Sequence, residues 1–126
     1  MIEKAFAGHF AADWIASWNA HDLERILAHY ADDFVMTSPV IPLIAGEPSG
    51  VLKGKAAIRA YWAAALRRTP NLHFELITTL AGVNSITLYY KGGRGLSAEV
   101  FHFDSQGRVI RAYAHYAGAV DASPQK

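Results

Sequence analysis

Glu99 stands out among the charged residues because it lies within an otherwise apolar-rich run, 98–103. In a strand, side chains two positions apart share a face, so Glu99 lies on the same face as Phe101 and Phe103. A carboxyl held among aromatic side chains has a raised pKa and can serve as a hydrogen-bond donor or an acid–base group. The alternative is a glutamate that pairs with an arginine or lies exposed near the end of its strand.

Other chemically reactive arrangements are scarce. The sequence has no cysteine, which excludes disulfides, thiolate zinc sites and cysteine nucleophiles. Gly46–Gly50 lacks the spacing of a nucleophile elbow, and Gly92–Gly95 is typical of a hairpin turn rather than of a phosphate-binding loop. The histidines show no metal-binding spacing; they are His9, His21, His29, His73, His102 and His115. We therefore expect no metal site and no cofactor.

The composition limits the classes of protein that the chain can represent. Its 126 residues allow one domain, and 52% hydrophobic residues supply one core. The formal net charge is +1 and the basic residues are scattered, so we expect no nucleic-acid partner and no membrane partner. Glu3 and Lys4 interrupt any N-terminal signal segment, and the apolar stretch 34–46 is too short to span a membrane. The sequence thus predicts a soluble, cytoplasmic protein.

The first half of the chain predicts helices that could position Glu99. Aromatic residues recur every four positions and predict an amphipathic helix over 3–19; they are Phe6, Phe10, Trp14 and Trp18. Asp22 is expected to cap a second helix that runs to about Tyr30. A third helix is expected over 55–68, where Ile58, Trp62 and Leu66 share a face.

Between the second and third helices we expect one short strand over 34–38, which Pro39 ends. The following residues, 39–53, contain three prolines and two glycines and are predicted to form a loop. This loop also carries six aliphatic residues larger than alanine, and an apolar loop of such length usually covers something.

From Asn71 the hydrophobic period changes to two, which predicts four strands over about 72–80, 84–91, 96–104 and 108–117. Three turns connect them, which predicts an antiparallel meander. Three helices with one inserted strand, followed by four strands, indicate an α+β fold.

This order of elements is accompanied by four segments with a family resemblance: DWIASWNAHDLERILAHYADDF (13–34), GKAAIRAYW (54–62), EVFHF (99–103) and GRVI (107–110). Together they resemble the nuclear-transport-factor-2-like superfamily, in particular its SnoaL-like and ketosteroid-isomerase-like members. The resemblance implies a cystatin-like cone, in which a strongly bent, mostly antiparallel sheet wraps around three helices and encloses a deep apolar pocket. It also implies a single SnoaL-like domain over 1–120, followed by a frayed tail over 121–126.

The ketosteroid isomerases of this superfamily combine a helix tyrosine, a base aspartate before a proline and a protonated carboxyl on the penultimate strand. By resemblance the corresponding positions here are Trp14, Ser38 and Glu99, so the base is missing and only the carboxyl remains. A serine cannot remove a carbon-bound proton at neutral pH without a neighbouring base. The sequence therefore argues against ketosteroid isomerisation.

Two other activities of the superfamily can be compared with the residues present here. The limonene-epoxide hydrolases use an Asp-Arg-Asp arrangement across adjacent strands, and this arrangement is absent here, where the positions hold Ser97, Glu99, Ala112 and Ala114. The polyketide cyclases of the SnoaL group manage with one principal acid–base carboxyl. The resemblance assigns that role to Glu99.

Matching Glu99 to the family's pocket carboxyl makes its face of the sheet concave, together with the even positions of the last strand, Ile110, Ala112, Ala114 and Tyr116. The small alanines leave volume that bulky side chains can enclose. We expect the ligand to contact Trp14, Trp18, Met36, Ser38, Trp62, Phe101, Ala112, Ala114 and Tyr116. For these aromatic residues, simple core packing is the alternative.

The opposite, convex face of the sheet is expected to carry polar and aromatic side chains, namely His73, Glu75, His102, Tyr113 and His115. Members of the superfamily commonly dimerise through this face, so the resemblance implies a homodimer. Plain exposure to solvent is the alternative.

These expectations lead to two hypotheses about function. In the first, the protein binds a small apolar or aromatic molecule; if it is an enzyme, it performs cofactor-free isomerase, cyclase or dehydratase chemistry. Glu99 is then the acid–base group, and Tyr30 or Trp14 donates a hydrogen bond. In the second, the protein is a non-catalytic binding module or a dimeric association module.

Overall fold

The computed structural model describes residues 1–118 and 120. The helices are α1 (Lys4–Asn19), α2 (Leu23–Leu27), α3 (Ile41–Ile44) and α4 (Lys55–Arg68). The strands are β1 (Tyr30–Thr37), β2 (Val51–Lys53), β3 (Glu75–Ala81), β4 (Ser85–Gly92), β5 (Gly95–Phe103) and β6 (Val109–Tyr116). The expected frayed tail over 121–126 lies outside the described residues.

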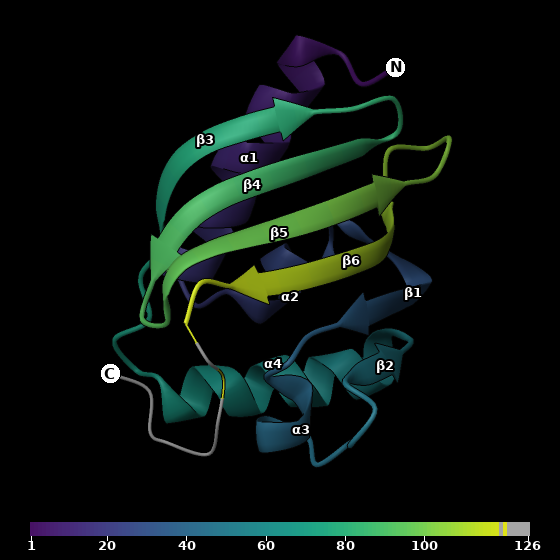
Figure 1. The fold of residues 1–126 in the computed structure, drawn as a ribbon. Coiled ribbons are helices and arrows are strands. Elements are labelled where there is room, and N and C mark those ends of the chain that lie inside the picture. Colours follow the sequence, from purple (N-terminus) through teal and green to yellow (C-terminus); the bar gives the residue numbers. More distant parts are fainter. Residues whose placement is uncertain (119, 121–126) are drawn as a thin grey trace.

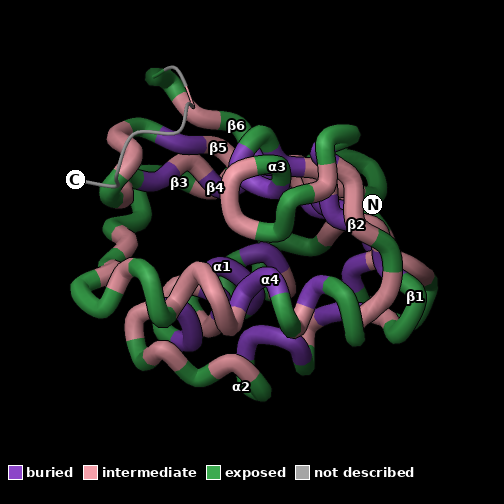
Figure 2. The backbone as a smooth tube through the Cα atoms, turned by 90° about the horizontal axis from the view of Figure 1, so that it is seen from below, coloured by how far each residue is buried: buried purple, intermediate pink, exposed green. Residues whose placement is uncertain are grey.

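All six strands form one curled sheet in the order β2-β1-β6-β5-β4-β3 (Figure 1). β1 runs parallel to β6 and every other neighbouring pair is antiparallel. Viewed from below, α1, α2 and α4 lie on one side of the sheet, and each contains buried residues (Figure 2). The α+β prediction is confirmed, and the enclosed side of the sheet is where a site can form.

Helix α1 forms as the aromatic repeat predicts. Its buried face contains Phe10, Trp14 and Trp18, and it packs against the inner face of the sheet. Phe101 of β5 meets this helix edge-on, with ring centroids 4.8 Å from Phe10 and 5.4 Å from Trp14. Burying each of these large side chains stabilises the fold by roughly 1.5–3 kcal/mol.

The second helix is shorter than the sequence predicts. Asp22 caps it as expected by accepting a hydrogen bond from the Arg25 backbone N–H at 3.2 Å, but α2 ends at Leu27. Tyr30, predicted at the end of this helix, is instead the first residue of β1 and pairs with Val109 of β6. The helix prediction rested on the spacing of nearby residues. It could not include the pairing of Tyr30 with the distant Val109, which makes Tyr30 part of the sheet.

The expected loop over 39–53 contains two short elements, so that prediction was wrong. Pro42 is compatible with α3 because it lies in the helix's first turn, where its missing N–H is not needed. β2 pairs antiparallel with β1, with Val51 opposite Thr37. The backbone N–H of Ser38 also donates to the carbonyl oxygen of Gly50 at 2.9 Å, which holds the ends of the segment together.

The four-strand meander is confirmed, and its turns fix which residues face inwards. Gly92 pairs with Gly95 across a two-residue turn, and Gly95 adopts a φ of 86°, a conformation that favours glycine. Between β5 and β6 the register shifts, because His102 pairs with Arg111 but Phe103 pairs with Val109. Val109 is therefore buried, while Ile110, predicted to face inwards, is only half-buried.

None of the helices among residues 1–118 has the combined length and hydrophobicity that crossing a membrane requires.

Candidate functional site

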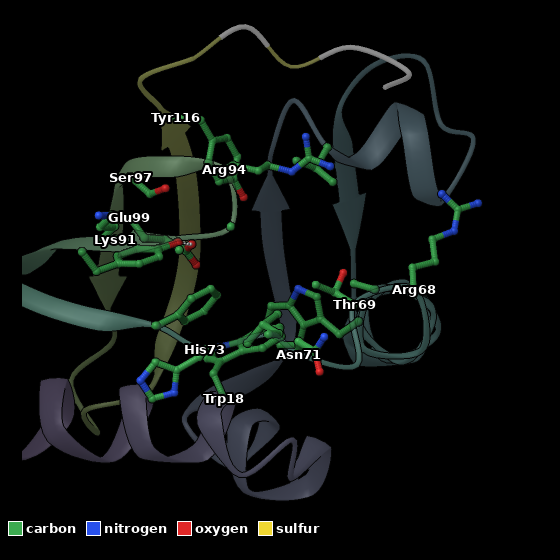
Figure 3. Close-up of a pocket in the computed structure, with 18 of the residues that line it drawn as sticks. Trp18, Arg68, Thr69, Asn71, His73, Lys91, Arg94, Ser97, Glu99 and Tyr116 are labelled. Carbon is green, nitrogen blue, oxygen red and sulfur yellow. Dashed lines mark hydrogen bonds between the residues drawn. The ribbon is translucent and has the colours of Figure 1, made fainter. Parts of the chain in front are cut away.

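A cavity of about 540 Å³ lies between the inner face of the sheet, α1, α4 and the segment that begins α3 (Figure 3). Its walls include the aromatic side chains of Trp14, Trp18, Trp62 and Phe74. Val40 and Ile44 also line it, so the apolar segment after β1 does cover a space. Polar side chains in and beside the cavity form three groups, one around Glu99, one around Ser38 and one around the opening.

Glu99 lies on the inner face of β5 and is 4% exposed. Its neighbours across the sheet are Leu88 of β4 and Ala114 of β6, neither of which offers a polar side chain. The hydroxyl of Tyr90 donates a hydrogen bond to Oε1 at 3.4 Å, a long contact that lowers the pKa only in part. Burial dominates and raises the pKa of Glu99 to about 8.

No cationic nitrogen lies within 4.0 Å of the Glu99 carboxyl among residues 1–118 and 120. The arginine-paired and exposed alternatives are therefore both wrong. At pH 7 the carboxyl is mostly protonated, so it can donate a hydrogen bond or a proton to a molecule in the cavity.

Trp14 in the cavity wall and Tyr30 behind it form a buried hydrogen-bonded pair. Trp14 Nε1 donates to the Tyr30 hydroxyl at 3.0 Å, and the Tyr30 ring packs against Phe34 and Trp62. Burial raises the pKa of Tyr30, and the nearby Glu99 raises it further. Tyr30 is thus close enough to Glu99 to sense its charge, but it does not line the cavity.

A second polar cluster is formed by Ser38, Tyr61 and Tyr116. The Ser38 hydroxyl accepts a hydrogen bond from the Val40 backbone N–H at 3.1 Å, the backbone role expected for a serine at a strand end. Burial raises the pKa of Tyr61 to about 12 and also raises that of Tyr116, while the nearby Ser38 hydroxyl opposes both shifts. Both phenols therefore stay protonated and are donors at neutral pH.

The opening of the cavity is lined by Arg68, His73, Glu75, Lys91 and Arg94. Glu75 pairs with Lys91, the neighbour of inward-facing Tyr90, so its position keeps the outward parity expected for it, while His73 lies before β3 begins. The Asn19 side chain binds the backbone N–H and C=O of Phe74 at 2.7 and 3.0 Å, which holds this segment over the end of α1 beside the opening.

The predicted site residues divide into two groups. Six of them line the cavity, namely Trp14, Trp18, Met36, Trp62, Glu99 and Tyr116. The other five are buried beside or behind it, namely Tyr30, Ser38, Phe101, Ala112 and Ala114. The described residues contain no group of three or more His, Asp or Glu side chains arranged to hold a metal ion.

The lining residues missed from the sequence include Tyr61, Tyr90 and Arg94. Tyr90 had a usable signal. A two-residue turn that pairs 92 with 95 places 90 opposite 97, on the same face as Glu99. Tyr61 lies beside Trp62 and three residues after Ile58, hence at the edge of the same helix face.

The described geometry agrees with comparisons to known proteins. The SnoaL-like domain family matches residues 11–117 of the chain. Among solved structures, a SnoaL-like protein of unknown function from Burkholderia thailandensis E264 is 58% identical, with a TM-score of 0.89 over 93% of this chain and 98% of that one. Among curated proteins there is no significant match.

Two more distant structures show the same fold. A candidate isomerase of the SnoaL-like family from Agrobacterium tumefaciens C58 is 19% identical, with a TM-score of 0.71 over 90% of this chain and 99% of that one. An uncharacterised cystatin-fold protein from Novosphingobium aromaticivorans is 20% identical, with a TM-score of 0.69 over 85% of this chain and 95% of that one.

Proposed function

This chain belongs to the SnoaL-like domain family, and from that premise we propose that its cavity binds a small apolar or aromatic molecule on which Glu99 acts as the acid–base group. The observation that carries the proposal is a carboxyl 4% exposed, without a cation beside it, on the wall of an aromatic cavity. Cavities of this size and lining suit flat apolar ligands.

The pKa of Glu99 suits proton transfer. At about 8 it lies close to neutral pH, so the acid and the carboxylate are both accessible. In an isomerisation the carboxylate removes a proton from one carbon and the resulting acid returns it to another. In a dehydration the acid protonates the departing hydroxyl, and the carboxylate then accepts a proton from the neighbouring carbon. Neither route needs a cofactor.

Glu99 has little competition for this role. Glu75 is the other carboxyl that lines the cavity, and it lies exposed at the opening. The Ser38 hydroxyl is engaged with the Val40 backbone N–H. These observations favour isomerase, cyclase or dehydratase chemistry that uses the single carboxyl of Glu99. Tyr30, which lies behind the cavity wall, is then a positioning residue. The distant relative from Agrobacterium is itself described as a candidate isomerase.

Ligand binding can be measured with the protein's own fluorescence, because all three tryptophans of the chain line the cavity. Aromatic and polyketide-like ketones that change this emission are then incubated with the protein in D₂O, and proton exchange beside the carbonyl is followed by NMR. We expect Glu99→Gln to bind the same ketones but to exchange at least about 100-fold more slowly. The matched control, Glu75→Gln, should keep the wild-type rate, and equal rates in wild type and Glu99→Gln would contradict the proposal.

A second role, as a non-catalytic binding or dimeric association module, is favoured by the outer face of the sheet. α1, α2 and α4 lie on the other side, and Leu80 and Leu96 are 59% and 42% exposed. Val100 and Tyr113 lie opposite each other near the centre of this face, both half-buried. We propose a homodimer through this face. Sedimentation should show a dimer at micromolar concentration and a monomer for Val100→Lys; a wild-type monomer would contradict it.

A further inference from the structure

We propose that the opening of the cavity selects an organic anion: a flat aromatic or alicyclic carboxylate, whose ring lies among the tryptophans and whose carboxylate is bound by Arg94. This inference rests on the proposed ligand-binding function and names the class of ligand. It concerns the mouth of the cavity rather than the carboxyl inside it.

Arg94 is held in place by its turn. It lies between Gly93 and Gly95 in the two-residue connection of β4 to β5, and it is half-buried although it occupies a hairpin tip. Figure 3 shows its side chain reaching from the hairpin across the opening, beside Tyr116. Its positive charge lies close enough to Tyr61 and Tyr116 to oppose the rise in the pKa of both phenols. The guanidinium is therefore directed over the cavity.

This guanidinium has no partner within residues 1–118 and 120. The ion pairs of this part of the chain use the cations Arg25, His29, Lys55 and Arg59. A guanidinium carries five N–H donors in a fork that matches a carboxylate, and half-burial has already removed part of its hydration. An anionic ligand would supply the acceptors that the described residues do not.

The charges around the cavity favour the same ligand. Arg68, Lys91 and Arg94 line it against one exposed carboxyl, Glu75, because Glu99 is mostly protonated at pH 7. The whole chain has a formal net charge of only +1, so positive charge is concentrated at this opening. A cleft of one sign with apolar walls attracts ligands of the opposite sign.

The spacing of the polar groups sets the shape of the ligand. Tyr116 pairs with Ser97, two residues along β5 from Glu99, which is a distance of about 7 Å along the strand. The two phenols and Arg94 can bind a carboxylate at the mouth. Glu99 can then reach a carbonyl or hydroxyl on the far side of one or two fused rings.

The test uses a matched pair of competitors at pH 7 and low salt. N-phenyl-1-naphthylamine, a neutral dye that fluoresces in apolar sites, reports on the cavity; 2-naphthoate and its near-isostere 2-acetylnaphthalene compete for it. We expect wild type to bind 2-naphthoate at least about tenfold more tightly than the ketone. Arg94→Gln should reduce this preference to about twofold or less, by weakening the binding of 2-naphthoate much more than that of the ketone.

Arg67→Gln is the control, because it removes an exposed cation from the same end of α4 without altering the lining. It should keep the preference for 2-naphthoate. In wild type that preference should also fall as salt is raised, which tests the charge without any substitution. Equal binding of both competitors would overturn the anion inference and leave the proposed binding function standing. Failure of the dye and both competitors to bind would overturn both, and an undiminished preference in Arg94→Gln would overturn the role of Arg94.

Discussion

Asp13 and Glu99 are two carboxyls of one small protein whose surroundings give them opposite properties. Asp13 lies on α1 with 40% of its side chain exposed, and it accepts hydrogen bonds from Arg25 Nε at 3.1 Å and from the His29 ring at 2.7 Å. These partners, Arg25 first, lower its pKa. Glu99 is buried with one phenol at 3.4 Å, and its pKa rises to about 8.

The comparison separates a structural carboxyl from a functional one. Asp13 joins α1 to the segment around α2, and its charge is stabilised where it lies. The charged form of Glu99 has no such partners, so burial keeps the carboxyl protonated. A buried ionisable group with a shifted pKa lowers stability above its ordinary pKa and is therefore a candidate for a functional residue. The following predictions test this difference, from the largest expected effect to the smallest.

The largest effect is expected for Glu99→Gln on stability above neutral pH. In the unfolded chain the glutamate ionises near its ordinary pKa of 4.5, whereas in the folded protein it stays protonated up to about 8. The wild type therefore loses stability as pH rises through this window, by about 4 to 5 kcal/mol at its upper end. Glutamine does not ionise, so the variant should be the more stable protein at pH 9 and nearly equal to wild type at pH 4.

Urea unfolding of both proteins at pH 4, 7 and 9 measures this gap. Glu75→Gln is the control, since removing an exposed carboxyl from the rim should change the free energy of unfolding by less than about 0.5 kcal/mol. A wild type as stable as Glu99→Gln at pH 9 would place Glu99 in water and remove the contrast with Asp13.

A smaller effect is expected for Tyr30→Phe. This change leaves the buried Trp14 Nε1 without its acceptor, which should cost about 1 to 3 kcal/mol. The double variant Trp14→Phe/Tyr30→Phe removes the donor as well, and a double-mutant cycle isolates the pair from the packing loss. A coupling energy near zero would show that the hydrogen bond does not support the wall behind Glu99.

Asp13→Asn should act in the opposite sense to Glu99→Gln. The lowered pKa of Asp13 contributes stability that is present above its unfolded value of 3.8 and is lost as pH falls through the folded value. Since the carboxyl is partly exposed, we expect a loss of only about 0.5 to 1 kcal/mol at pH 7, reduced by salt. Thermal unfolding at pH 7 and pH 2.5 checks this, and a loss that persists at pH 2.5 would contradict it.

The smallest effect is expected for Tyr90→Phe, which removes the hydrogen bond that lowers the pKa of Glu99. The carboxyl should titrate at a higher pH than in wild type. Because the contact is long, the change should be small compared with the effect of burial. NMR titration of the variant measures it, and a shift to lower pH would show that Tyr90 does not donate to the carboxylate.

The sequence predicts the inner face of β5 well, because strand alternation is a local property. Glu99, Phe101 and Phe103 are buried on one side as expected, while Ala98, Val100 and His102 are only partly buried. The aromatic repeat of α1 and the extent of α4 follow from helical spacing in the same way. The family resemblance added the concave side of the sheet, and thereby the cavity.

Contacts between distant segments explain what the sequence missed. Tyr30 joins β1 through its pairing with Val109, and the register shift beside Phe103 turns Val109 inwards instead of Ile110. The hydrogen bonds between Asn19 and Phe74 bring His73 to the opening. None of these pairings leaves a periodic signal in the residues around it.

The most direct test of the account is the titration of the Glu99 carboxyl, followed by carbon-detected NMR on the free protein and assigned by comparison with Glu99→Gln. The account predicts a midpoint near pH 8, because the carboxyl is buried without a cation beside it. A midpoint at or below 4.5, the ordinary value for a glutamate, would mean that Glu99 is solvated or paired with a cation, and would contradict the acid–base role proposed for it.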